Sequence, residues 1–192
     1  MNISDLLSGN LGQQVIDGIS QQVGTSKEDT SSVVNSATPV LLGMLKNNAS
    51  SKEGAAGILS ALNEHDGGIL DNLGGFLNSG NTTDGENILG HILGDKKQAV
   101  ENQLSRTTGV SNANVSKIIA MLAPIVMGQL GKQAGSGNVS SEGGINDLLG
   151  NLIGGGNSSG LAGNILGSVL GGGNKKSGGG LGDMIGGILG KK

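Results

Sequence analysis

Cysteine is absent from this chain of 192 residues. Its absence excludes disulfide bonds, catalysis by a thiol and any zinc site that uses cysteine ligands. Tryptophan and tyrosine are also absent, and phenylalanine occurs once. The core must therefore consist of Leu, Ile, Val, Met and Ala side chains, which suit closely packed helices. Because single-strand binding proteins usually stack bases on aromatic rings, this composition argues against nucleic-acid binding.

Charged residues are few and nearly balanced. The chain holds 12 Lys and Arg against 15 Asp and Glu, which gives a formal net charge of −3. Arg106 is the sole arginine, so no arginine cluster is present to bind phosphate or carboxylate groups. A nucleic-acid-binding surface needs a dense group of basic residues. We therefore expect no nucleic-acid partner.

Residues with catalytic or metal-binding chemistry are equally sparse. The histidines, His65 and His91, lie near acidic residues, but neither group offers the three or four ligands that a metal ion needs. His65 ends a predicted helix, where a histidine commonly interacts with the helix dipole. The chain contains no GxSxG, HExxH, P-loop or EF-hand motif. We expect a non-enzymatic protein with no catalytic residue, no metal and no cofactor.

Long apolar runs are missing as well. The longest near the middle of the chain, Ile118 to Met127, has ten residues, whereas a membrane-spanning helix needs about 20. The first residues, MNISDLLSGN, have neither the basic nor the apolar region of a secretory signal. We expect a cytoplasmic protein with no transmembrane segment.

Glycine, in contrast, is abundant and unevenly distributed. Of the 39 glycines, 18 lie before Ala134 and 21 lie in residues 134–192. The sequence therefore predicts a domain over residues 1–133, which is long enough to bury one core, and a glycine-rich low-complexity tail over residues 134–192.

The predicted domain contains an internal repeat. Residues 1–47 match residues 86–132 without a gap when the sequence is shifted by 85 positions. The stretch TPVLLGMLKN in the first copy corresponds to APIVMGQLGK in the second, and Pro39 and Pro124 coincide. These matches predict an internal duplication, and the helical spacing of the apolar residues predicts an all-α multihelical bundle.

Small polar residues and glycines mark the predicted helix ends. Side-chain oxygens at a helix start accept hydrogen bonds from free backbone N–H groups, and glycine adopts the left-handed conformation that ends many helices. The predicted N-caps are Asn10, Ser26, Asp95 and Ser111, the predicted C-terminal glycines are Gly24 and Gly109, and capping boxes over Ser50–Glu53 and Thr83–Glu86 predict further helix starts.

Each proline lies inside a long predicted helix. Proline lacks an N–H donor and crowds the preceding turn, so it kinks or breaks a helix. Thr38 is a plausible cap for a helix that starts at Pro39, which favours a full break in the first copy. Ala123 is a poor cap, which favours only a kink at Pro124.

Gly43 and Gly128 lie four residues after the two prolines, in segments that are apolar on nearly all faces. Such helices are usually central and buried. Because glycine lets another backbone approach closely, we expect the two copies to contact each other at Gly43 and Gly128. A ligand site formed by these segments is the less favoured alternative.

The tail repeats an eight-residue motif: Asp or Asn, two apolar residues, Gly, any residue, two apolar residues, Gly. It occurs as DLLGNLIG (147–154), NILGSVLG (164–171) and DMIGGILG (183–190), and inside the domain as NILGHILG (87–94). On a helix the glycines share one face, which lets another helix approach closely. The proposed contact glycines in the tail are Gly150, Gly154, Gly163, Gly167, Gly171, Gly182, Gly186 and Gly190.

Each glycine inside a helix costs about 1 kcal/mol relative to alanine, so a motif helix needs a partner. That partner is the domain, another copy of the chain, or a lipid interface, for which Lys191 and Lys192 give weak support. The alternative is a disordered linker.

The motifs of residues 1–133 resemble those of a bacterial family. An N-terminal DLL, TPVLLGMLKN, the DGGILDNLGGFL stretch at 66–77 and APIVMGQLGK are together similar to the YidB-like family, domain of unknown function 937. The resemblance implies an all-helical fold with no established activity, and it carries over no catalytic residue.

The function that we expect is structural: a non-enzymatic interaction protein that self-associates through its glycine-rich apolar tail and so forms a homo-oligomer. The alternatives are a module that binds a small apolar ligand, or weak contact with a lipid or membrane surface through the tail. The sequence does not identify a partner protein.

Overall fold

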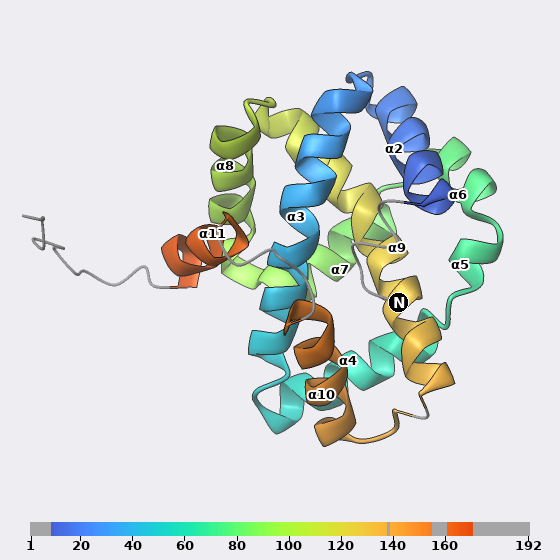
Figure 1. The fold of residues 1–192 in the computed structure, drawn as a ribbon, viewed down its shortest axis with the longest axis vertical. Helices are drawn as coiled ribbons and strands as arrows, with labels where there is room; N and C mark the ends of the chain where they lie inside the picture. The colour runs from blue at the N-terminus through green and yellow to red at the C-terminus, as the bar shows by residue number, and fades with distance from the viewer. Residues whose placement is uncertain (1–8, 138, 155–160, 171–192) are drawn as a thin grey trace, which may run out of the picture.

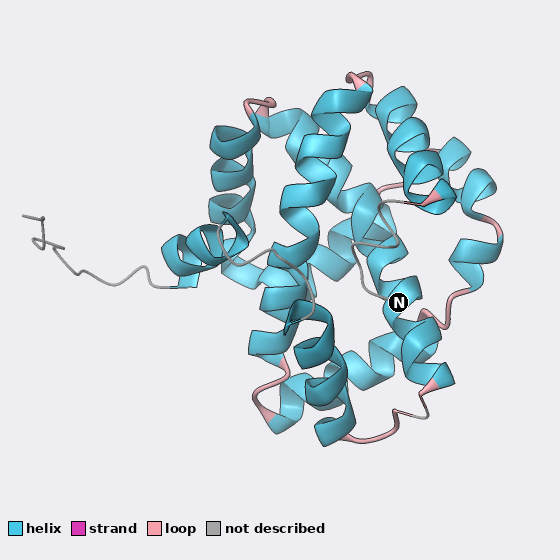
Figure 2. Ribbon diagram, viewed as in Figure 1, coloured by secondary structure: helices cyan, strands magenta, loops and turns pink. Residues whose placement is uncertain are grey.

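The computed structural model describes residues 9–137, 139–154 and 161–170, and these form helices without strands (Figure 2). The predicted all-α fold is confirmed. In chain order the elements are α2 (Asn10–Val23), α3 (Lys27–Asn48), α4 (Lys52–Glu64), α5 (Gly68–Asp71), α6 (Leu73–Ser79), α7 (Thr83–Leu93), the 3-10 helix η1 (Gly94–Lys96), α8 (Lys97–Thr108), α9 (Asn112–Ser136), α10 (Glu142–Gly154) and α11 (Leu161–Leu170).

The longest helix, α9, runs through the core and packs against α2, α3, α4, α5, α7 and α8 (Figure 1). Every residue from Ile118 to Gly131 is buried. Apolar side chains cover all faces of this stretch, so it is stable only when surrounded by other helices. By length and composition alone, α9 could cross a membrane, but 72% of its apolar window is buried inside the fold, as in the core helix of a globular protein.

The predicted caps around the α2–α3 and α8–α9 connections are confirmed. The Ser26 side chain accepts a hydrogen bond from the Asp29 backbone N–H at 3.0 Å, and Ser111 accepts one from Asn114 at 3.3 Å. The preceding helices end at glycines in the left-handed conformation, Gly24 and Gly109. The two copies thus have helix pairs at matching positions, and their origin by duplication stays a prediction.

The other predicted helix starts are wrong by one or two residues. In each case the chain caps the helix with a neighbouring residue or leaves it without a side-chain cap. Asn10 is already helical, because Gly9 precedes α2, and Thr83 is likewise the first residue of α7. Asp95 lies in η1, before α8 begins. Helix α4 is capped by Ser51, not Ser50, and the Ser51 side chain accepts a hydrogen bond from the Gly54 backbone N–H.

The predicted break at Pro39 is also wrong. Helix α3 continues through Pro39, as α9 does through Pro124. Thr38 is not a cap: its hydroxyl donates to the carbonyl oxygen of Val34, one turn earlier, at 2.7 Å. An interior proline costs about 3 kcal/mol, whereas each fully buried Leu or Ile stabilises the fold by about 1.5–3 kcal/mol. Burial of the apolar residues around each proline therefore keeps both helices continuous.

The glycines after the prolines contact other helices than we expect from the sequence. A Cβ atom added at Gly43 would lie against Leu166 of α11, and one added at Gly128 would lie against Ile69 of α5. Helices α3 and α9 do pack together, but these two glycines provide room for side chains from later and intervening segments instead. The prediction that the copies meet at Gly43 and Gly128 is therefore incorrect.

At two other glycines, one in α7 and one in α9, the backbone of a neighbouring segment lies directly against the backbone of α9 or of its partner. A Cβ atom at Gly85 in α7 would clash with the carbonyl oxygen of Ala120 in α9. A Cβ atom at Gly131 in α9 would clash with the carbonyl oxygen of His65, just after α4. These contacts fix the start of α7 and the end of α4 against the same helix.

The described part of the tail packs on the domain. Helices α10 and α11 both lie against α3, and α10 also contacts α4 (Figure 1). Ile145, Leu149 and Ile165 are fully buried by this packing. Helix α9 itself continues past residue 133 to Ser136. The division of the chain at residue 133 stays a prediction, but the first two tail motifs do lie in helices.

A pair of alanine substitutions in α7 tests the close approach. We expect Gly85→Ala to lower the free energy of unfolding by about 1–3 kcal/mol, because the added methyl group meets backbone that cannot shift alone. Gly90→Ala in the same helix meets open space, so it should raise stability by up to about 1 kcal/mol. Urea unfolding followed by circular dichroism measures both. Equal effects of the two substitutions would contradict the contact.

Candidate functional site: the cleft between α4 and α7

Helices α4 and α7 border a cleft in the described structure. Both pack against α3 and α9, but they make little direct contact with each other. The space between them has a volume of about 800 Å³. This is the size of a typical small-molecule pocket, and both histidines of the chain line it.

A hydrogen bond lies at each end of the cleft, one from α3 to α7 and one from the end of α4 to α7. At one end, the Asn48 side chain donates to the carbonyl oxygen of Ile92 at 3.0 Å, which joins the end of α3 to the end of α7. At the other end, His65 reaches Asp84 in the first turn of α7. The helices are therefore antiparallel, and the cleft between them is bounded at each end.

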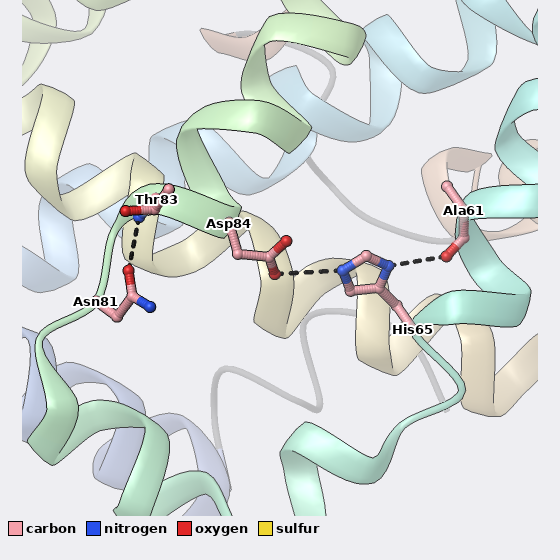
Figure 3. Close-up of polar contacts among 5 residues, drawn as sticks. All are labelled: Ala61, His65, Asn81, Thr83 and Asp84. Atoms are coloured by element: carbon pink, nitrogen blue, oxygen red, sulfur yellow. Dashed lines mark hydrogen bonds and ion pairs between the residues drawn. The ribbon is translucent and has the colours of Figure 1, made fainter.

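His65 lies between two oxygen atoms (Figure 3). Its Nδ1 atom is 2.8 Å from the carbonyl oxygen of Ala61, and its Nε2 atom is 3.3 Å from Oδ2 of Asp84. Both partners accept hydrogen bonds, so both ring nitrogens must carry hydrogen for the two bonds to form together. In its protonated form the ring can therefore make both bonds, whereas in its neutral form it can donate only one of them.

The sequence at the two helix ends determines where Asp84 and His65 lie. Asn81 accepts a hydrogen bond from the Thr83 backbone N–H at 2.9 Å, a turn that starts α7 and puts Asp84 in its first turn (Figure 3). His65 is the residue that follows the last turn of α4. Anionic groups are favoured at helix starts and cationic groups at helix ends, so both helix dipoles favour this arrangement. The expected role of His65 at a helix end is thus supported by its bond to Ala61.

The glycine contacts with α9 hold both partners. Gly85 follows Asp84 and lies against the Ala120 carbonyl, while the His65 carbonyl lies against Gly131. The backbones on both sides of the ion pair are therefore anchored to the buried helix. The pair itself is partly accessible, since the side chains of His65 and Asp84 are 18% and 52% exposed.

The cleft has an apolar floor and a polar rim. Buried side chains from four helices form the floor: Leu45, Ile58, Ile88, Ile92 and Met127. The rim has amides, hydroxyls, imidazoles and two carboxylates: Asn48, Ser51, Ser60, Glu64, His65, Asp84, Asn87 and His91. Such a surface can hold an apolar body and bind a polar head group.

The contact with Ala61 limits the chemistry of His65. Its Nδ1 atom lies 2.8 Å from a carbonyl oxygen, which leaves Nε2, facing Asp84, as the ring nitrogen open to other partners. In the described residues, no group of three or more His, Asp or Glu side chains is arranged to hold a metal ion. The arrangement is suited to binding a ligand and to connecting α4 with α7.

The residues singled out in the sequence do not form one site. Pro39 and Gly43 lie in α3, and Pro124 and Gly128 lie in α9. Among the tail glycines, Gly163 and Gly167 are exposed and have open space at their Cβ positions. Gly150 lies near Lys46, and Gly154 is the last residue of α10. The remaining four, Gly171, Gly182, Gly186 and Gly190, fall outside the described residues.

The cleft itself was not predicted from the sequence. Its residues come from four helices and are distributed from Leu45 to Met127. The signal in the sequence is the pair of histidines near acidic residues, which by itself indicates a role for His65 at a helix end and no shared site. Their shared position becomes visible only once α4 and α7 are placed against α9.

Comparison with known proteins identifies one family. A family model described as "Bacterial protein of unknown function (DUF937)" matches residues 5–133, which covers the cleft and ends within α9. No curated protein and no solved structure matches the chain. The family expected from the sequence motifs is confirmed.

A double-mutant cycle tests the connection across the cleft. We expect His65→Ala to destabilise the protein by about 1–2 kcal/mol, since it removes hydrogen bonds to Ala61 and Asp84. Asp84→Ala removes one of them and should cost less. The coupling energy of the partly exposed pair should be about 0.2–1 kcal/mol in urea unfolding at mildly acidic pH, where imidazoles are protonated.

The exposed Lys27–Asp17 pair serves as the control, with its Nζ and Oδ1 atoms 2.7 Å apart and side chains 60% and 39% exposed. A coupling energy for His65 and Asp84 of zero, with the control pair measurable, contradicts the contact.

Proposed function

Because this chain belongs to a bacterial family of unknown function, DUF937, we propose its role from the structure: it is a non-enzymatic interaction protein that self-associates through its tail motifs. The observation that supports this proposal is the burial of the repeated tail motif, which differs among its copies in the described structure. Each described copy packs as a helix through its apolar positions, and the copies differ in how completely they are covered.

The coverage of the motif decreases along the chain. In α7 all four apolar positions are buried, whereas the copies in α10 and α11 have two and one buried positions. These positions are Ile88, Leu89, Ile92 and Leu93 in α7; Leu149 and Leu152, with Leu148 and Ile153 partly buried, in α10; and Ile165, with Leu166 and Val169 partly buried and Leu170 exposed, in α11.

Helix α11 consequently has an uncovered face. Gly163, Gly167 and Leu170 are spaced by four and three residues, so they share one side of the helix, and all three are exposed. Leu170, at 37% exposure, is the exposed large hydrophobic residue of the described structure. Two such faces can approach closely because glycine adds no side chain between the backbones.

The partner that fits this face is a second copy of α11. An isologous contact between two copies would cover Leu170 on both and set glycine against glycine. The motif at 183–190, outside the described residues, repeats the same pattern and offers further copies for association. Weak contact of Leu170 and the terminal lysines with an anionic membrane surface is the alternative use of the same tail.

A second function, binding of a small ligand, is favoured by the cleft between α4 and α7. Its apolar floor, polar rim and volume of about 800 Å³ are those of a pocket that encloses a small molecule. This function is independent of the tail, so the chain can have both.

Leucine substitutions in the full chain test self-association. Gly163→Leu with Gly167→Leu should block close approach of two α11 helices and shift the protein towards monomer in sedimentation velocity. The substitutions should not unfold α11, because leucine favours helix over glycine by roughly 1 kcal/mol per position. Gly90→Leu, at the corresponding motif position in α7, also meets open space and serves as the control.

The proposal fails if the unaltered chain is monomeric at high concentration, or if the double variant associates as strongly as the control. Co-sedimentation with vesicles of phosphatidylglycerol and phosphatidylcholine separates the membrane alternative. Binding to the vesicles by a monomeric chain would support that alternative over self-association.

A further inference from the structure

We propose that the cleft between α4 and α7 binds an aliphatic molecule with a primary ammonium or guanidinium head. This inference rests on the small-ligand function proposed above and names the chemical class of its ligand. It follows from three properties of the cleft: its apolar floor, the sign of the charges on its rim, and the kinds of side chain that it lacks.

The floor selects an aliphatic body. Ile58 of α4 and Ile88 and Ile92 of α7 line the cleft, together with Leu45 of α3 and Met127 of α9. All five are buried in the fold with exposures of 7% or less. A flat aromatic ring gains much of its affinity from stacking on another ring, and no aromatic side chain lines this cleft. The methylene groups of an aliphatic chain, in contrast, need no aromatic partner, because they are buried favourably against branched aliphatic side chains.

The rim selects a cationic head. Glu64 and Asp84 are carboxylates, and no lysine or arginine lines the cleft. His65 can pair with Asp84 as a cation only when its ring is protonated, and Asp84 is 52% exposed and so open to a further partner. In the described residues, no ion pair to Glu64 is formed. An anionic head would face two carboxylates, whereas a cationic head would complete their pairing.

The head must also donate hydrogen bonds. Quaternary ammonium groups are usually recognised by aromatic cages, which this cleft lacks. Glu64, Asp84 and the side-chain carbonyl of Asn87 offer oxygen acceptors at the His65 end of the cleft. Primary ammonium and guanidinium groups carry several N–H donors that can use them together. The aliphatic body then extends over the isoleucines towards the Asn48 end.

The limited length of the cleft favours a small molecule over a peptide helix. The cleft is bounded at both ends, by the His65–Asp84 pair and by the bond from Asn48 to Ile92. A small aliphatic amine fits within it.

Calorimetric titration of the full chain with n-octylamine tests this class. We expect n-octylamine to bind, and 1-octanol and octanoate to bind at least about tenfold more weakly, because a charged hydrogen bond is lost or repulsion is added. Glu64→Gln should weaken amine binding by about tenfold for the same reason. Asp71→Asn, an exposed carboxylate of α5 outside the cleft, should leave it unchanged.

A second variant localises the binding without removing a charge. Gly57 lines the cleft and has open space at its Cβ position, so Gly57→Leu fills the cleft and favours α4. It should abolish amine binding, while Gly90→Leu, whose residue does not line the cleft, should not.

The outcomes separate this inference from the function on which it rests. If 1-octanol binds as tightly as n-octylamine and Gly57→Leu abolishes both, the amine class is wrong and a small-ligand site stands. If no probe binds, or if Gly57→Leu changes nothing, the site itself is disproved. Neither result bears on self-association, which sedimentation measures.

Discussion

The structure depends on burial of the central part of α9 among mainly aliphatic side chains. Its residues from Ile118 to Gly131 are all buried, and Phe76 is the one aromatic residue of the chain. Aromatic rings fill wide gaps between helices, whereas Leu, Ile and Val reach a shorter distance. The helices must therefore approach α9 closely, and glycine permits this where carbonyl oxygens meet it, at Gly85 and Gly131.

The cleft is a consequence of those two contacts. They bring the start of α7 and the end of α4 to α9, but at separate points of that helix, Ala120 and Gly131. The two helices are thereby held on one support without packing against each other. The space left between them receives both polar and apolar side chains because it lies at the edge of the core. The His65–Asp84 pair spans this gap and does not create it.

Local features could be predicted from the sequence with good accuracy. Ser26 and Ser111 cap their helices as predicted, because a serine side chain and the N–H three residues later need no distant partner. The helix pairs and the all-α class followed from the same local signals. The start of α8 was predicted wrongly because Asp95 enters a 3-10 turn that leads into the helix.

Tertiary features could not be predicted from the same signals. Pro39 has a local preference to break the helix, and burial of its neighbours outweighed that preference. Gly43 was correctly seen as a packing position, yet its neighbour is Leu166, from a tail helix more than 100 residues later. The two histidines are 26 residues apart, and only the placement of two helices brings them to one cleft.

The repeated motif also has a consequence for how the chain folds. Segments with nearly the same eight residues compete for docking faces that accept the same apolar pattern, so incorrect pairings between them are compact and slow to correct. The copy in α7 is the best buried and is also the first to be synthesised. Vectorial synthesis lets it occupy its place beside α9 before the tail copies emerge from the ribosome. The order of the motifs along the chain thus means that synthesis presents the copies one after another, whereas refolding of the complete chain presents all of them at once.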